Sequence, residues 1–230
     1  MQKTPHFFDI FSYSVYTVAI VLKLHTPQGG GPMLALLKKD FETLTKQYKM
    51  HVILLVFFLF AGSVSTSDEF FSTFPMVVCS WFTSNIISWD ERQEGTKEIA
   101  RKPYVMSKYL FQLVLVALSM TVCVTGLANR YEVGSYDFNN VLLMMLAASL
   151  LVPTIMLPII FKNSAAKSFL KYFAVLIIGV GMCYYFSAAF VARWIAPIGL
   201  GLVIGAAVLL LALYFASYKL SVKYYEKREL

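Results

Sequence analysis

Charged residues are scarce in this chain, and cysteine is rarer still. Asp, Glu, Lys and Arg make up 14% of the 230 residues, against about 25% in an ordinary soluble domain. The 3 cysteines are far apart, and none has a second cysteine or a histidine at metal-ligand spacing, so we expect neither a disulfide framework nor a metal site. These shortages exclude a water-soluble enzyme, a nucleic-acid-binding domain and a disulfide-bonded ectodomain.

Long apolar runs dominate the sequence instead. Hydrophobic residues make up 58% of the chain and the mean hydropathy is +0.66. The apolar residues fall in blocks of about 20, the length of a helix that crosses about 30 Å of hydrocarbon. The alternation typical of a membrane β-barrel is absent, so helices must satisfy the backbone polar groups in lipid. We therefore predict an all-α, polytopic membrane protein with six transmembrane helices, over residues 51–67, 70–89, 109–128, 141–161, 169–192 and 195–218.

Basic residues indicate the orientation of these spans. Sixteen Lys and Arg lie in the segments on one side of the predicted spans, whereas the opposite side holds only Arg130 and Arg193. Because cytoplasmic loops collect Lys and Arg, we expect residues 33–230 to form one six-span domain with both ends cytoplasmic. Residues 1–32 end in a Gly/Pro-rich run, and a linker, upstream sequence or a seventh span all stay open for them.

The segment 33–46 has the pattern of an amphipathic helix. Its apolar residues recur at spacings of three and four, namely Leu34, Leu37, Phe41 and Leu44. Its charged residues occupy the other positions, namely Lys38, Lys39, Asp40 and Glu42. This helix is too polar to span, so we expect it to lie in the plane of the interface with its basic flank toward lipid phosphates. The alternative is a cytoplasmic extension of the first span.

A second polar segment separates the second and third predicted spans. Residues 90–108 carry many charges of both signs over nineteen residues, where a simple turn needs only a few. We expect a short charged helix that docks in a cleft of a soluble partner; a solvated loop that binds lipid headgroups is the alternative. The candidate partner-binding residues are Asp90, Glu91, Glu94, Glu98, Arg101, Lys102, Pro103, Tyr104 and Lys108. Tyr104 and Tyr109, near the end of a span, are also candidate interface anchors.

Two short runs resemble a known family. The run ARKPYVMSKYLFQL, which follows an acidic WDE, is similar to the cytoplasmic signature of small ABC-2 type permeases, and MLALLKKDF is similar to their amphipathic start. The likeness covers about residues 33–223 and is strongest to permeases of peptide-toxin exporters, such as the phenol-soluble modulin exporter. In that family the helix before the first span is an elbow helix, here with Leu37, Lys38, Lys39 and Phe41.

The resemblance also implies partners. The subunit would work as a homo- or heterodimer of permeases in contact with membrane lipids, and would bind two copies of an ATP-binding-cassette ATPase. The loop after the second span would hold the coupling helix. The residues carried over are Asp90 and Glu91 at the start of that loop, and Arg101, Val105, Ser107, Lys108 and Tyr109 at its end.

The chain itself has no motif for ATP hydrolysis. It lacks a GxxxxGK[ST] phosphate-binding loop, so we expect it to be no enzyme and to hold no cofactor, with ATP and Mg²⁺ bound by the partner. The predicted spans contain almost no ionisable residue at depth, which disfavours an ion-coupled carrier. With the resemblance, we expect the permease of an exporter in a bacterial cytoplasmic membrane, for an amphipathic or hydrophobic substrate such as a peptide toxin or antimicrobial peptide. A secondary carrier, a channel and a non-transporting immunity protein are the alternatives.

Mild polar residues within the spans are candidates for a substrate path. They lie on the second and third predicted spans and are Ser80, Ser84, Ser88, Gln112 and Ser119. The competing interpretation is that they form hydrogen bonds between helices, each worth about 0.6 kcal/mol.

Overall fold

Helices make up all the regular secondary structure in the part of the chain that the structure describes. The computed structural model describes residues 32–47, 68–92, 101–163 and 199–228, together with a few residues between 171 and 181. The helices are α2 (Pro32–Gln47), α4 (Asp68–Arg92), α5 (Arg101–Ala128), α6 (Tyr136–Asn163) and α9 (Leu200–Glu226). The predicted first span, most of the fifth and the N-terminal extension lie outside the described residues.

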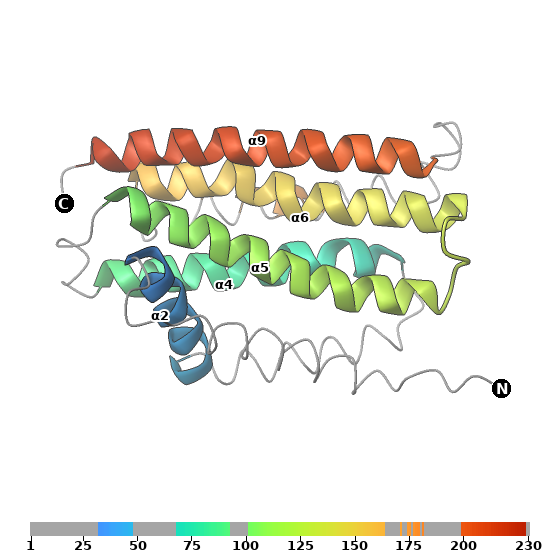
Figure 1. Cartoon of the computed structure of the whole chain (residues 1–230), viewed down its shortest axis with the longest axis horizontal. Coiled ribbons are helices and arrows are strands. Elements are labelled where there is room, and N and C mark those ends of the chain that lie inside the picture. Colours follow the sequence, from blue (N-terminus) through green and yellow to red (C-terminus); the bar gives the residue numbers. More distant parts are fainter. Residues whose placement is uncertain are drawn as a thin grey trace.

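Four long helices lie lengthwise beside one another, and α2 crosses α4 and α5 steeply near one end (Figure 1). At that end α4, α6 and α9 finish and α5 begins. Four basic residues therefore lie there, namely Arg92, Arg101, Lys162 and Arg228. We call it the basic end. It is the end for which the distribution of Lys and Arg predicts a cytoplasmic position.

Three of the described helices are long and apolar enough to cross a membrane, namely α5, α6 and α9. They cover the predicted spans 109–128, 141–161 and most of 195–218. Helix α4 covers the predicted span 70–89 but is not in this group; it carries Asp68, Glu69 and a row of serines. That the chain has six transmembrane spans therefore stays a prediction.

Two helices extend further toward the basic end than we predicted. Helix α5 begins at Arg101 instead of residue 109, and α9 ends at Glu226 instead of residue 218. Aromatic side chains pack these extra turns together: Tyr104 stacks on Tyr225 with ring centroids 5.4 Å apart, and Phe161 of α6 meets Tyr225 edge-on at 5.5 Å. Burial of these rings stabilises helix beyond the apolar blocks.

Helix α6 continues through two prolines. Pro158 has no N–H to donate to the carbonyl of Thr154, one turn earlier. The hydroxyl of Ser217 in α9 donates to that carbonyl at 2.7 Å, so the proline frees an acceptor that the neighbouring helix uses. This bond is part of the packing of α6 on α9.

The buried face of α2 differs from the predicted apolar stripe. Its buried residues are Leu36, Leu37, Asp40, Thr43 and Leu44. Leu34, predicted to be in the stripe, is 39% exposed, whereas Phe41 packs edge-on against Phe111 of α5 at 5.0 Å. The helix is thus rotated so that a carboxylate lies in the middle of its contact with α4 and α5, and the reason is the charge that it meets there.

Candidate functional site

Four charged side chains meet where α2 crosses α4 and α5. The Lys108 ammonium donates to Oδ1 of Asp40 and lies 2.5 Å from Oδ2 of Asp90. The Lys39 ammonium donates to Oδ1 of Asp90 at 2.7 Å. Asp40, Asp90 and Lys108 are fully buried, whereas the Lys39 side chain is 42% exposed. We call these four residues the ion-pair cluster.

The ion-pair cluster is neutral as a whole but unevenly satisfied. An unpaired buried charge is costly, and Lys108 avoids this cost by contacting both carboxylates. The ring of Tyr104 adds a cation–π contact, with the ammonium 4.9 Å from its centroid. Oδ2 of Asp40 and Oδ2 of Asp90 are both buried without a hydrogen-bond partner among the described residues, although Asp90 Oδ2 lies 2.5 Å from the Lys108 ammonium as an ion pair. Burial raises the pKa of Asp40 above its ordinary value of 3.8, Lys108 and Lys39 oppose the rise, and Asp90 adds to it.

Tyr109, the residue after Lys108, connects α5 to α9. The Tyr109 hydroxyl lies 2.8 Å from Ser217 and 2.7 Å from Ser221, both in α9. Since Ser217 gives its one proton to the Thr154 carbonyl, Tyr109 donates to Ser217 and accepts from Ser221. Tyr214 donates to the backbone carbonyl of Tyr109 at 2.9 Å. We call these five residues the hydroxyl network.

The first residue of α5 binds the end of α9. The Arg101 guanidinium donates to the backbone carbonyls of Tyr225 and Glu226 in the last turn of α9, where carbonyls lack intrahelical donors. The Tyr225 carbonyl also accepts from the backbone N–H of Arg228 at 3.3 Å. Nearby, Arg228 forms an ion pair with Glu91 at the end of α4, at 2.8 Å. The segment 101–109 therefore contacts α2, α4 and α9 through polar groups, and it contacts α6 through the rings of Tyr104 and Tyr109 on Phe161.

The polar segment between the second and third spans is shorter than we expected. Helix α4 continues to Arg92 and α5 begins at Arg101, so residues 93–100 alone separate them, and Glu94 and Glu98 lie outside the described residues. Helix continues on both sides because the charges there find partners within the chain.

The other candidate partner-binding residues differ in their exposure. Lys102 is exposed, and Glu91, Arg101 and Pro103 are half-buried. Asp90, Tyr104 and Lys108 are buried in this conformation, so a partner protein has no access to them. Direct contact of the accessible residues with an ATPase stays a prediction.

Two other predictions for this region were wrong. Tyr104 and Tyr109 are 1% and 3% exposed, so they pack inside the chain instead of anchoring it at the lipid surface. Asp40 is buried, although we placed it on the polar face of its helix. The spacing of Leu36, Leu37 and Leu44 around Asp40 is the sequence signal that would have indicated this.

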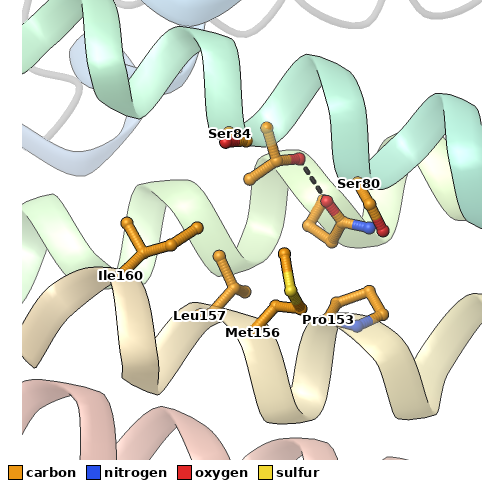
Figure 2. Close-up of a pocket in the computed structure, with 8 residues that line it drawn as sticks. Ser80, Ser84, Pro153, Met156, Leu157 and Ile160 are labelled. Atoms are coloured by element: carbon orange, nitrogen blue, oxygen red, sulfur yellow. Dashed lines mark hydrogen bonds between the residues drawn. The ribbon is translucent and has the colours of Figure 1, made fainter. Parts of the chain in front are cut away.

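Three of the candidate path residues line one small cavity between α4, α5 and α6 (Figure 2). They are Ser80, Ser84 and Gln112, with Thr83 donating to Oε1 of Gln112. The cavity has a volume of about 10 Å³, which is room for at most one water molecule. Ser80 Oγ and Gln112 Nε2 are buried there without a partner in the described part of the chain. In this conformation the cavity is too small for any substrate.

The two remaining candidates make separate contacts. Ser119 in α5 lies 3.0 Å from the Cys79 sulfur of α4 and donates to the carbonyl of Leu115. Ser88 accepts a hydrogen bond from Arg92, one turn later, at 3.3 Å. Ser119 thus has the role of an interhelical contact, which was the competing interpretation, and a path through all five residues stays a prediction.

The apolar helices, with a polar junction at their basic end, define a multi-pass α-helical membrane protein. The chain matches the family described as ABC-2 family transporter protein over residues 35–226, which is most of its length. It therefore belongs to this family, and the resemblance to ABC-2 permeases is confirmed. The match includes the whole ion-pair cluster. No curated protein and no solved structure matches the chain.

Proposed function

We propose that the chain is the permease subunit of an ATP-driven exporter for amphipathic or hydrophobic peptides. The observation that carries the proposal is the family match over residues 35–226 in a sequence that has no phosphate-binding loop of its own. A permease of this kind needs its energy from outside the chain. The energy source we propose is a separate ATPase subunit, present in two copies beneath a dimer of permeases.

The segment 93–100 is the part of the basic end that we propose for contact with the ATPase. It contains Glu94 and Glu98 and leads directly to the exposed Lys102. A push on this segment would reach the start of α5, where Lys108 bonds to α2 and α4 and Tyr109 bonds to α9. The force would thus spread to both sides of the bundle through buried polar contacts, which are rigid because each requires a specific geometry.

The chemistry of the spans supports the substrate class that we propose. The described surface of α9 is apolar, with Leu202, Val208, Leu209 and Phe215 all more than half exposed. A sugar or an ion would lose its hydration against such surfaces without compensation, whereas an apolar helix would not. This supports an amphipathic peptide and disfavours a hydrophilic cargo.

The test is ATP hydrolysis by the complex isolated with this chain. The chain is purified in mild detergent from membranes of its own host, reconstituted in liposomes, and assayed with an amphipathic helical peptide or with a neutral sugar. We expect an ATPase to co-purify and the peptide to stimulate hydrolysis. Stimulation by the sugar alone would contradict the peptide assignment, and flux without ATP would favour a carrier or channel.

Charge reversal tests the contact site. Glu94→Lys and Glu98→Lys should uncouple ATP hydrolysis from peptide transport, because the proposed contact would then repel its partner. Glu132→Lys, in the exposed turn at the other end of the bundle, is the matched control. Normal transport by both reversals would contradict the role of segment 93–100.

A further inference from the structure

The ion-pair cluster divides into two neutral halves at the surface of α2. Helix α2 contributes Lys39 and Asp40, whereas α4 and α5 contribute Asp90 and Lys108. If α2 moved away, Lys108 would keep Asp90 as its partner, and no unpaired charge would remain buried in the bundle. Lys39 and Asp40 would enter water together. Separation of α2 from the rest of the described chain would therefore leave no buried charge without a partner of opposite sign.

Docking of α2 gives the Asp40 carboxylate few hydrogen bonds in exchange for the water that it loses. Of its two carboxylate oxygens, Oδ1 accepts from Lys108, but Oδ2 is buried without a partner. A carboxylate in water has all its acceptor sites filled, so docking of α2 costs Asp40 part of its solvation. The apolar contacts of α2, through Leu36, Leu37 and Leu44, hold the helix against that cost.

We propose that α2 is a releasable arm, which undocks from α4 and α5 and docks again, with Asp40 as the group that favours release. Docked, the arm covers Lys108; released, it leaves the Lys108–Asp90 pair behind. The outer face of α2 carries Lys38 and the exposed pair of Glu42 and Lys46. The helix therefore stays amphipathic after release and can lie on the lipid surface. The proposal does not depend on peptide export.

The proposal is distinguished from a fixed ionic anchor by the sign of two effects. In a fixed anchor, loss of Asp40 loosens α2. In a releasable arm, Asp40→Asn removes the solvation cost while Lys108 keeps Asp90, so α2 docks more tightly. Lys108→Met leaves two carboxylates facing each other in the docked state and should release α2. Adding Asp40→Asn to Lys108→Met removes one of them and should restore docking.

The test measures how often α2 undocks in the full chain. Cys79, Cys123 and Cys183 are replaced by alanine, and Leu44→Cys places a thiol on the buried face of α2. The reaction of this thiol with a water-soluble maleimide, in lipid nanodiscs, reports the open population. We expect Asp40→Asn to slow labelling several-fold, and Lys108→Met to speed it by at least about tenfold. The double variant should return toward the parent rate.

Two controls keep the result decisive. Glu42→Gln removes a carboxylate from the exposed face of the same helix and should leave labelling unchanged. A cysteine at Lys102, exposed on α5, must label equally in every variant that is folded. Faster labelling of Asp40→Asn, or a double variant as fast as Lys108→Met, would overturn the proposal. If Lys108→Met does not fold, the comparison of Asp40→Asn with Glu42→Gln decides it, since a rate at or above the parent's would contradict it.

Discussion

Lys108 and Tyr109 are consecutive residues of α5 that bind opposite sides of the bundle. The Lys108 ammonium lies 2.5 Å from Asp90 of α4, whereas the Tyr109 hydroxyl lies 2.7 Å from Ser221 of α9. Successive side chains on a helix point about 100° apart, so two neighbours can face different helices. The start of α5 therefore connects α2 and α4 on one side to α9 on the other.

Loss of the buried cation should destabilise the fold. Lys108→Met removes the charge that pairs Asp40 and Asp90, and a broken buried pair costs about 3–5 kcal/mol. The measurement is denaturant unfolding in mild detergent. Lys102→Met, which removes an exposed lysine from the same helix, is the control and should change the unfolding free energy little. Equal unfolding free energies of the two variants would show that the ion-pair cluster does not stabilise the fold.

Loss of one hydroxyl should weaken the contact of α5 with α9. Tyr109→Phe leaves Ser217 and Ser221 without their common partner, which we expect to cost about 1–2 kcal/mol of unfolding free energy. Tyr218→Phe removes the same atom from a half-buried ring that packs on Tyr109 and serves as the control. The same change in both variants would mean that loss of any tyrosine hydroxyl here has this effect, and would contradict a specific role of the hydroxyl network.

The stability of the chain should depend on pH through Asp40. Burial raises the pKa of this carboxyl above 3.8, so the folded chain holds a proton at pH values where the unfolded chain has lost it. The contribution of Asp40 to stability is therefore full below pH 3.8 and is lost as the pH rises through the raised pKa. Asparagine cannot lose this proton.

The measurement is the difference in unfolding free energy between Asp40→Asn and the parent. Lys39, Asp90 and Lys108 are present in both proteins, so the two proteins differ only in the group at position 40. As the pH rises above 3.8 and through the raised pKa of Asp40, the parent should lose stability relative to Asp40→Asn. A slope of the opposite sign would mean that the Lys108 pair outweighs burial.

Removal of the arginine at the start of α5 should loosen only the end of α9. Arg101→Gln takes its donors away from the carbonyls of Tyr225 and Glu226. We expect amide hydrogen exchange in the last turn of α9 to rise by about threefold, since such contacts at a helix C-terminus are worth below about 1 kcal/mol. Exchange near Leu200, at the far end of α9, should not change. A rise along the whole helix would contradict a local role for Arg101.

Much of the architecture is readable from short stretches of sequence. The amphipathic segment 33–46 was predicted as a helix and is found as α2, and the apolar blocks at 109–128 and 141–161 lie within α5 and α6. The motif ARKPYVMSKY led to the ABC-2 family, which the match confirms. The site was harder to predict: Lys108 and Tyr109 were singled out as motif residues, but as parts of an exposed docking loop.

Whether a segment forms a spanning or an amphipathic helix depends on the length of its apolar run and on the periodicity of its apolar residues. Both are properties of neighbouring residues, so the sequence alone determines them. Which face of α2 is buried depends on a charge 68 positions away, where Lys108 meets Asp40. Only the tertiary structure brings α2, α4 and α5 together, and in it the buried carboxylate of Asp40 is compensated by a cation from another helix. Tertiary structure likewise decides the hydrogen bond from Ser217 to the Thr154 carbonyl that Pro158 leaves free, because the two residues are 63 positions apart.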